Sequence, residues 1–245
     1  MDDYIANLRV KYDQPYPQNP QQYPYKHTQI IYGTNVLYAD EDNDSPSLDA
    51  EGILRVQSIV GALLFYGCSV NNKLFVSLSE LEQQQAAATQ ATNYDLMQLL
   101  DYVATYPSDR INFRSSDMVL TAHYDAAYIN VPEARSRSGA HIMLPEDVPV
   151  STYNGSILTI DQIIINFMSS ATESKLEGFF ICAKEMVPLR KALIEMGWPQ
   201  PKSPIQCDNS TFIVVANETI IPQKTKSMDM QFHWLCCRDS QGQFR

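Results

Sequence analysis

The sequence predicts a mixed α/β (α+β) fold, in which a small helical connection subdomain precedes a ribbon of strands that form a mixed sheet with flanking helices. Two observations lead to this prediction. Apolar residues recur at helical spacing between residues 49 and 105, and the apolar period shortens to that of strands after residue 108. The second part continues as a long helix, a short strand and a last helix, an order that is typical of α+β or mixed α/β domains.

The helical part contains three predicted helices. The first begins at Asp49, whose side chain can cap the helix N-terminus. The next two span residues 73 to 84 and 93 to 105, and Pro107 stops the last one because proline cannot continue a helix. The apolar stripe of the first helix comprises Ile53, Val56, Ile59, Val60, Leu63 and Leu64.

The sheet part contains short strands and three predicted helices. One helix is expected from Ser170 to Met196, and its central Pro188 predicts a kink or a break near Met186. The triplet Asp208-Asn209-Ser210 can cap a further helix. Strands are expected at residues 111 to 113, 118 to 124, 139 to 144, 157 to 160 and 205 to 207, and the last helix at 226 to 238.

Three segments are therefore expected: residues 1 to 28 as a Tyr/Pro-rich arm or linker, 29 to 115 as the helical connection subdomain, and 116 to 245 as the sheet domain. Residues 12 to 25 hold four prolines and four tyrosines without an aliphatic residue, which favours extended chain over a packed element. We interpret this stretch as a linker or as an arm that docks on a protein partner.

Composition limits the possible functions. The net charge is −10, which divides into −7 for residues 1 to 115 and −3 for residues 116 to 245. A protein that grips phosphates normally has a basic excess, so a strong stand-alone nucleic-acid binder is not expected. No apolar run predicts a membrane span or a removable signal. The 5 cysteines lack C-x-x-C spacing, which favours an intracellular location, cytoplasmic or nuclear.

Two carboxylates stand where a sheet would present them to a ligand. Asp125 follows one predicted strand and Asp208 lies at the carboxyl end of another, the edge of an open sheet where ligand sites form. Two such aspartates with a helix-borne acid can hold two Mg²⁺ ions for phosphodiester cleavage. Spacing alone favours a plainer alternative, in which Asp125 caps a turn and Asp208 caps a helix.

Four ordered blocks of the sequence carry a family resemblance. They read LTAHYDAAY at 120–128 with ARSRSG at 134–139, MSSATESKL at 168–176 with AKE at 183–185, PIQCDNST at 204–211, and TKSMDMQFHW at 225–234. Together they resemble the ribonuclease H domain of copia-type retrotransposon Pol polyproteins. The segments at 52–65 and 101–107 are similar to the connection between the reverse-transcriptase thumb and ribonuclease H. The resemblance covers about residues 26 to 245.

The resemblance implies a ribonuclease H fold, whose relatives cleave the RNA strand of RNA–DNA hybrids with Mg²⁺ and an Asp-Glu-Asp-Asp set. By position, Asp125 matches the first-strand aspartate and Asp208 the aspartate after the fourth strand. Lys175 stands where family members carry the glutamate. The last family aspartate lies beyond a strand that begins near residue 242, so the chain is expected to lack it.

No neighbouring acid can take the role of the family glutamate, whose position Lys175 occupies. Glu173 and Glu177 lie two residues either side of it, about 200° around the helix, and point away from its face. Because two bare aspartates repel each other, an ammonium between them would offset the repulsion without a metal. We therefore hypothesise that Lys175 bonds to Asp125, Asp208 or both in the place of Mg²⁺. A distance above about 6 Å from both would refute this.

The remaining candidates are weaker. Arg135 and Arg137 could contact a nucleic-acid backbone or belong to a solvated turn, and the sequence leaves both open. Structural roles are expected for His123, Cys207, Asp229 and His233.

Three functions remain. The first is a retrotransposon-derived ribonuclease H-like protein with impaired catalysis, because of Lys175 and the missing acid. The second is an active ribonuclease H segment of a longer Pol polyprotein. The third is a domesticated, non-enzymatic module that binds a protein partner through residues 12 to 25.

Overall fold

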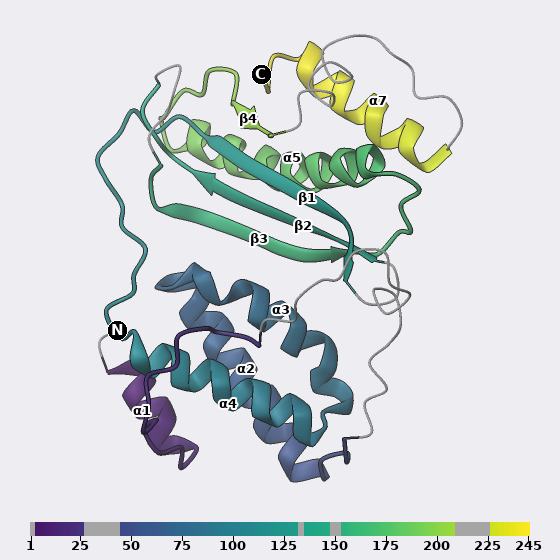
Figure 1. Cartoon of the computed structure of the whole chain (residues 1–245). Coiled ribbons are helices and arrows are strands. Elements are labelled where there is room, and N and C mark those ends of the chain that lie inside the picture. Colours follow the sequence, from purple (N-terminus) through teal and green to yellow (C-terminus); the bar gives the residue numbers. More distant parts are fainter. Residues whose placement is uncertain (1–2, 27–44, 132–134, 148–152, 209–225) are drawn as a thin grey trace. The chain divides into compact units, whose positions relative to one another are not determined.

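The computed structural model describes residues 3–26, 45–131, 135–147, 153–208 and 226–245. The chain forms two compact units, Met1–Ile111 and Asn112–Arg245 (Figure 1). We call the first the helical unit and the second the sheet unit. The division falls close to the boundary that the sequence suggests after residue 115. The segment interpreted as a separate arm belongs to the helical unit.

The helical unit is built on the three predicted helices, α2 (Ala50–Ser69), α3 (Phe75–Gln84) and α4 (Gln90–Thr105). Asp49 caps α2 by accepting a hydrogen bond from the Gly52 N–H at 2.8 Å, as expected. Two 3₁₀ turns, Asn72–Leu74 and Gln85–Ala87, flank α3. The core includes Val56, Ile59, Leu63, Leu74, Leu78, Leu96, Leu99 and Leu100.

Helix α2 is long and apolar enough to cross a membrane, by length and composition alone. Its apolar stripe, however, is buried against α3 and α4: Val56, Ile59 and Leu63 have no exposed surface. A core helix of a globular unit has the same composition, and the packing of α2 is of this kind.

Helix α1 (Tyr4–Lys11) corrects one prediction, because these residues were expected to belong to an arm or linker. Ile5 and Leu8 are buried in the core of the helical unit. Arg9 is only 1% exposed; it donates a hydrogen bond to the Leu100 carbonyl at 2.9 Å and pairs with Asp101 at 3.1 Å. A buried charge needs such partners, and these partners cannot be predicted from the sequence close to Arg9.

Residues 12 to 25 form neither helix nor strand, as predicted, but they dock on their own unit. The Gln21 N–H donates to Thr105 Oγ1 at 3.0 Å, and the Gln98 side chain donates to the Tyr23 carbonyl at 3.2 Å. The Tyr106 hydroxyl contacts Gln22 Oε1 at 2.7 Å. The arm is therefore held along the C-terminal half of α4.

The sheet unit contains β1 (Thr121–Val131), β2 (Arg135–Met143), β3 (Ser156–Ile164) and β4 (Ile205–Gln206), in the order β3-β2-β1-β4. The first three strands are antiparallel, and β4 runs parallel to β1. Beyond β4, the backbone of residues 243 to 245 bonds to Ser203 and Ile205 at 2.9 to 3.0 Å. This mixed sheet confirms the predicted α/β class.

The predicted strand at residues 111 to 113 does not form. The Asn154 side chain forms two hydrogen bonds with the backbone of Arg114. Its Oδ1 accepts from the Arg114 N–H at 2.8 Å, and its Nδ2 donates to the Arg114 carbonyl at 3.0 Å. The same amide donates to the Leu144 carbonyl at 2.7 Å, and Oδ1 accepts from the Gly155 N–H at 2.8 Å. One side chain thus satisfies four backbone groups, of Arg114, Leu144 and Gly155, just after the segment predicted as a strand.

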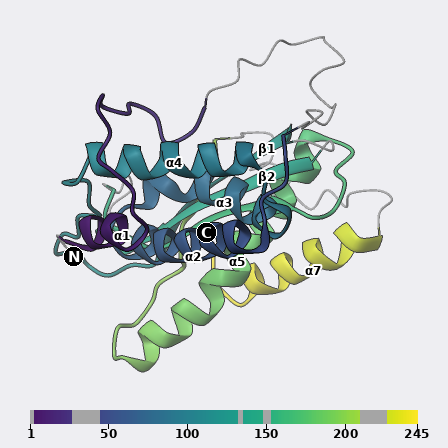
Figure 2. The same ribbon diagram turned by 90° about the horizontal axis from the view of Figure 1, so that it is seen from below.

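Helix α5 (Ala171–Glu195) packs across one face of the sheet, and α7 (Lys226–Ser240) packs against α5 (Figure 1, Figure 2). Ser170 caps α5 by accepting from the Glu173 N–H at 3.2 Å. Of the kink or break predicted near Met186, the break does not occur, since α5 runs through Pro188. Met186 is fully buried in the core, and this packing holds both sides of the proline in one helix. The helix expected after Asp208 lies outside the described residues.

Candidate functional site

The site lies where β1, β4 and the start of α5 meet. Asp125 is on β1 and Asp208 follows β4, and the two strands pair in parallel through Ala122 with Ile205 and His123 with Gln206. Asp208, just past the carboxyl end of β4, therefore lies beside Asp125, which is within β1 and not after the strand as the sequence suggests. Open α/β sheets form ligand sites at the carboxyl ends of their strands.

Lys175 joins the two aspartates. Its Nζ donates hydrogen bonds to Asp125 Oδ1 and, at 2.9 Å, to Asp208 Oδ1. The contact hypothesised from the sequence is therefore present, and it involves both carboxylates. The Lys175 side chain is 12% exposed, whereas those of Asp125 and Asp208 are 67% and 76% exposed. Most of the Lys175 side chain is thus enclosed by the protein, and the carboxylates that it contacts face solvent.

The charges of the three groups stabilise one another. Burial lowers the pKa of Lys175, but the bonds and charges of Asp125 and Asp208 outweigh this effect, so that its pKa is raised. The hydrogen bond from Lys175, followed by its charge, lowers the pKa of Asp208. Lys175 is consequently a cation and Asp208 an anion at neutral pH.

Small residues bring α5 close enough to β1 for this contact. The Ser174 hydroxyl donates to the Ala127 carbonyl at 3.2 Å. A Cβ on Gly178 would lie 2.9 Å from the Ala126 Cβ, so only glycine fits there without a shift. Sequence reasoning missed both positions. Their signal is a pair of small residues four apart on the helix face that meets the sheet.

The described acids do not offer a third ligand for a metal. Glu173 Oε2 accepts from the Ser169 N–H at 2.7 Å and so closes the N-terminus of α5. Among the residues that the structure describes, no three His, Cys, Asp or Glu side chains gather at one point. Mg²⁺ needs several oxygen ligands in octahedral array. Two carboxylates already bridged by an ammonium do not fit the two-ion site that the resemblance implies.

One comparison with known proteins agrees with the resemblance. No protein-family model matches the chain. Over 138 residues the chain is 23% identical to the retrovirus-related Pol polyprotein from transposon TNT 1-94 of Nicotiana tabacum. The chain is similar to a copia-type Pol polyprotein. The match covers 56% of this chain and 10% of the polyprotein, so the chain corresponds to a small part of that relative.

A solved structure also matches the Pol-like chain. It is LC11-RNase H1, isolated from compost, with a TM-score of 0.36 and 9% sequence identity over 51% of this chain and 77% of that one. In the described sheet Asp125 is on the first strand, β1, and Asp208 follows the fourth, β4. The described sheet with its flanking helices confirms the mixed α/β class predicted from the sequence.

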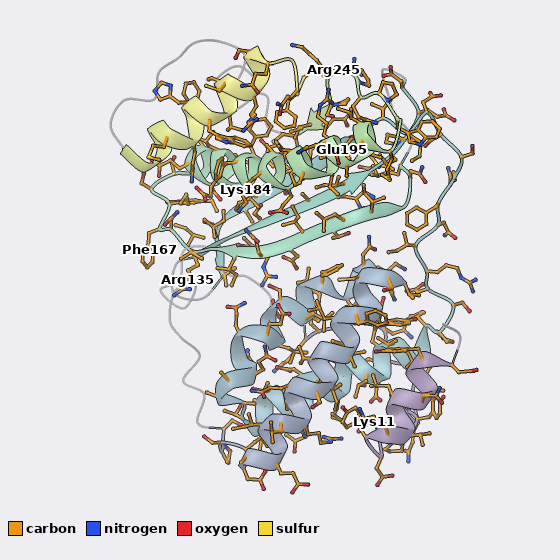
Figure 3. The ribbon with its side chains drawn as sticks, turned by 180° about the vertical axis from the view of Figure 1, so that it is seen from behind. Lys11, Arg135, Phe167, Lys184, Glu195 and Arg245 are labelled. Atoms are coloured by element: carbon orange, nitrogen blue, oxygen red, sulfur yellow. The ribbon has the colours of Figure 1, made fainter. Side chains whose placement is uncertain are left out.

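Arg135 and Arg137, for which the sequence leaves open a nucleic-acid contact or a solvated turn, both lie on β2. Arg137 Nη1 contacts both carboxylate oxygens of Asp161, at 3.1 and 3.2 Å, and its side chain is 11% exposed. Its charge is therefore balanced within the sheet. Arg135 begins β2 opposite Val131, and Figure 3 shows it at the same end of the unit as Phe167. A contact with nucleic acid stays a prediction for both.

Of the other candidates, only Cys207 is recorded in contact with a side chain of the site among the described residues. His123 faces His141 across β1 and β2, with the Tyr153 ring 4.8 Å from its own. Burial, followed by the charge of His141, lowers the pKa of His123. Cys207 packs against the core and lies 3.8 Å from Asp208 Oδ1. His233 lies on α7, and the side chain of Asp229 is outside the described part.

Proposed function

We propose that the sheet unit is a retrotransposon-derived, ribonuclease H-like domain in which an ammonium replaces the catalytic metal and RNA cleavage is impaired. The observation that carries this proposal is the position of Lys175, bonded to Asp125 and Asp208 at once. The proposal rests on the Pol similarity for ancestry and on these contacts for the loss of chemistry.

Electrostatics explains why such an ion pair opposes metal binding. A divalent ion between Asp125 and Asp208 would first have to displace the Lys175 ammonium, whose stem is enclosed by the protein. A metal that entered beside the ammonium would meet a positive charge at contact distance. Water activation and stabilisation of the leaving oxygen both require the ion to stand at the carboxylates.

The charge pattern of the unit agrees with weak binding of nucleic acid. Arg137 is paired with Asp161, and Lys202 lies 3.6 Å from Asp239. Arg245 lies 3.0 Å from Asp147. These cations are paired with acids of the protein itself. Affinity for nucleic acid depends on cations that neutralise the phosphates of its backbone.

Cleavage of a labelled RNA–DNA hybrid by the full chain tests the proposal, with Mg²⁺ and with Mn²⁺. We expect no metal-dependent cleavage by the natural sequence and no difference from Asp125→Asn. Lys175→Glu restores the third carboxylate, and calorimetry should show Mg²⁺ binding by this variant and none by Lys175→Met. Cleavage by the natural chain that is lost in Asp125→Asn would instead support an active ribonuclease H segment of a longer polyprotein.

A further inference from the structure

Strand β3 forms one edge of the described sheet. It pairs with β2 from Ser136 opposite Ile164 to Ile142 opposite Leu158, and one irregularity lies at its first residue, opposite Met143. Within the described part of the chain, no strand pairs with its other side. The outer N–H and C=O groups of an edge strand are a template for another strand.

The composition of β3 does not protect this edge. Its sequence, SILTIDQII, contains no lysine, proline or glycine, the residues that usually discourage pairing. Ile157 is 39% exposed, and Ile165, just past the strand end, is 84% exposed. The single charged residue, Asp161, is 8% exposed and neutralised by Arg137 of β2. An approaching strand therefore meets no unpaired charge on β3.

We propose that β3 pairs in antiparallel register with β3 of a second copy of this chain, about a two-fold axis at Ile160. The sequence is self-complementary in that register. Ile157 lies opposite Ile163 of the second copy, and Thr159 lies opposite its Asp161, and each pair occurs twice. An isologous contact of this kind closes after two subunits and continues both sheets into one.

The partner class follows from the chemistry of the edge. Backbone donors and acceptors in a row select an extended strand, and cross-strand pairs of β-branched residues stabilise it. An isoleucine opposite an isoleucine satisfies this rule at both ends of the contact. The proposal is independent of Lys175 and of any nuclease activity.

Sedimentation of the full chain over a range of concentrations is the first test. We expect a reversible dimer that Ile157→Lys weakens about tenfold or more, because each dimer contains the changed pair twice. Met230→Lys is the matched control: Met230 is 76% exposed on α7, away from the sheet edge, and the dimer should be unchanged. If the chain stayed monomeric up to about 100 μM, a concentration far above the dissociation constants of typical specific interfaces, the proposal would be overturned.

Cross-linking tests the register. Ile157→Cys chains are mixed with Ile163→Cys chains and oxidised. Directly opposite residues of antiparallel strands lie about 4.5 to 5.5 Å apart at Cα, within the reach of a disulfide. The mixture should form a covalent dimer that neither variant forms alone, with the unchanged chain as the blank for its exposed Cys68, Cys236 and Cys237. A reversible dimer without this cross-link would rule out the β3 pairing.

Discussion

Lys175 Nζ lies 2.9 Å from Asp208 Oδ1, and this bond fastens α5 to the residue that follows β4. The bond lowers the pKa of Asp208. We expect an NMR titration of the Asp208 carboxyl to give a pKa below the ordinary aspartate value, and Lys175→Met to return it toward that value. The contribution of Asp208 to stability is therefore present above its unfolded pKa and is lost as the pH falls through the folded pKa.

Lys202→Met is the control for this titration. Lys202 pairs with Asp239 rather than with the site, so its loss should leave the Asp208 titration unchanged. The pKa of Lys175 is shifted the opposite way, and its contribution to stability is lost as the pH rises through its raised folded pKa. An Asp208 pKa that does not respond to Lys175→Met would show that the ion pair is not formed in solution.

Two glycine substitutions should act in opposite directions. A Cβ at Gly178 would lie 2.9 Å from the Ala126 Cβ, so Gly178→Ala overpacks the contact between α5 and β1. We expect overpacking of about 1–3 kcal/mol to exceed the helix-propensity gain of about 0.5–1 kcal/mol. Thermal unfolding should show a lower midpoint.

Gly61→Ala is the matched comparison. No atom lies within 4 Å of a Cβ at Gly61, which is inside α2, so the change should stabilise the helical unit by about 0.5–1 kcal/mol. Equal effects of the two substitutions would contradict the close approach of α5 to the sheet.

The Arg9–Asp101 pair predicts an asymmetry between its two halves. Asp101→Ala leaves a buried guanidinium without its counter-ion and should destabilise the protein by about 3 kcal/mol. Arg9→Met fills the space with an apolar chain and should cost less. In the double variant, Arg9→Met should recover part of the loss caused by Asp101→Ala. Denaturant unfolding of the four proteins measures the coupling, and additive effects would exclude it.

Cys182 should react more slowly with alkylating reagents than the exposed cysteines do. Burial, followed by the charge of Glu185, raises the pKa of its thiol to about 12. At pH 8 about one part in ten thousand is then thiolate, the reactive form. Mass spectrometry after alkylation should show Cys68, which is exposed, modified long before Cys182. Unfolding should remove the difference; equal rates in the folded protein would show that Cys182 is accessible.

Local chemistry made much of the fold predictable. Asp49 and Ser170 begin α2 and α5 as expected, because each cap is a bond between a side chain and the backbone three residues on. The start of α4 was placed too late, since Thr89 and Thr92 form its capping box and the usual signal is Glu or Gln at the second position. Helix α1 was missed because Arg9 depends on partners about 90 residues away.

The site was predictable in part for a different reason. The order and spacing of the family's motifs identified Asp125, Lys175 and Asp208, and the structure brings all three together. The close approach that allows this contact depends on Ser174 and Gly178, whose role is visible only when α5 lies on the sheet. Arg137 was expected to face solvent or nucleic acid, but it is paired with Asp161. This pair could not be predicted because it depends on the pairing of β2 with β3.

The amide of Asn154 serves four backbone groups at once, and the residue after it is Gly155. An asparagine before glycine is prone to slow hydrolytic deamidation. The resulting aspartate could no longer donate to the Arg114 and Leu144 carbonyls and would place a negative charge against both. Chemical ageing of stored protein should therefore loosen this corner first, and an Asn154→Gln preparation, although it fits less well, would resist that decay.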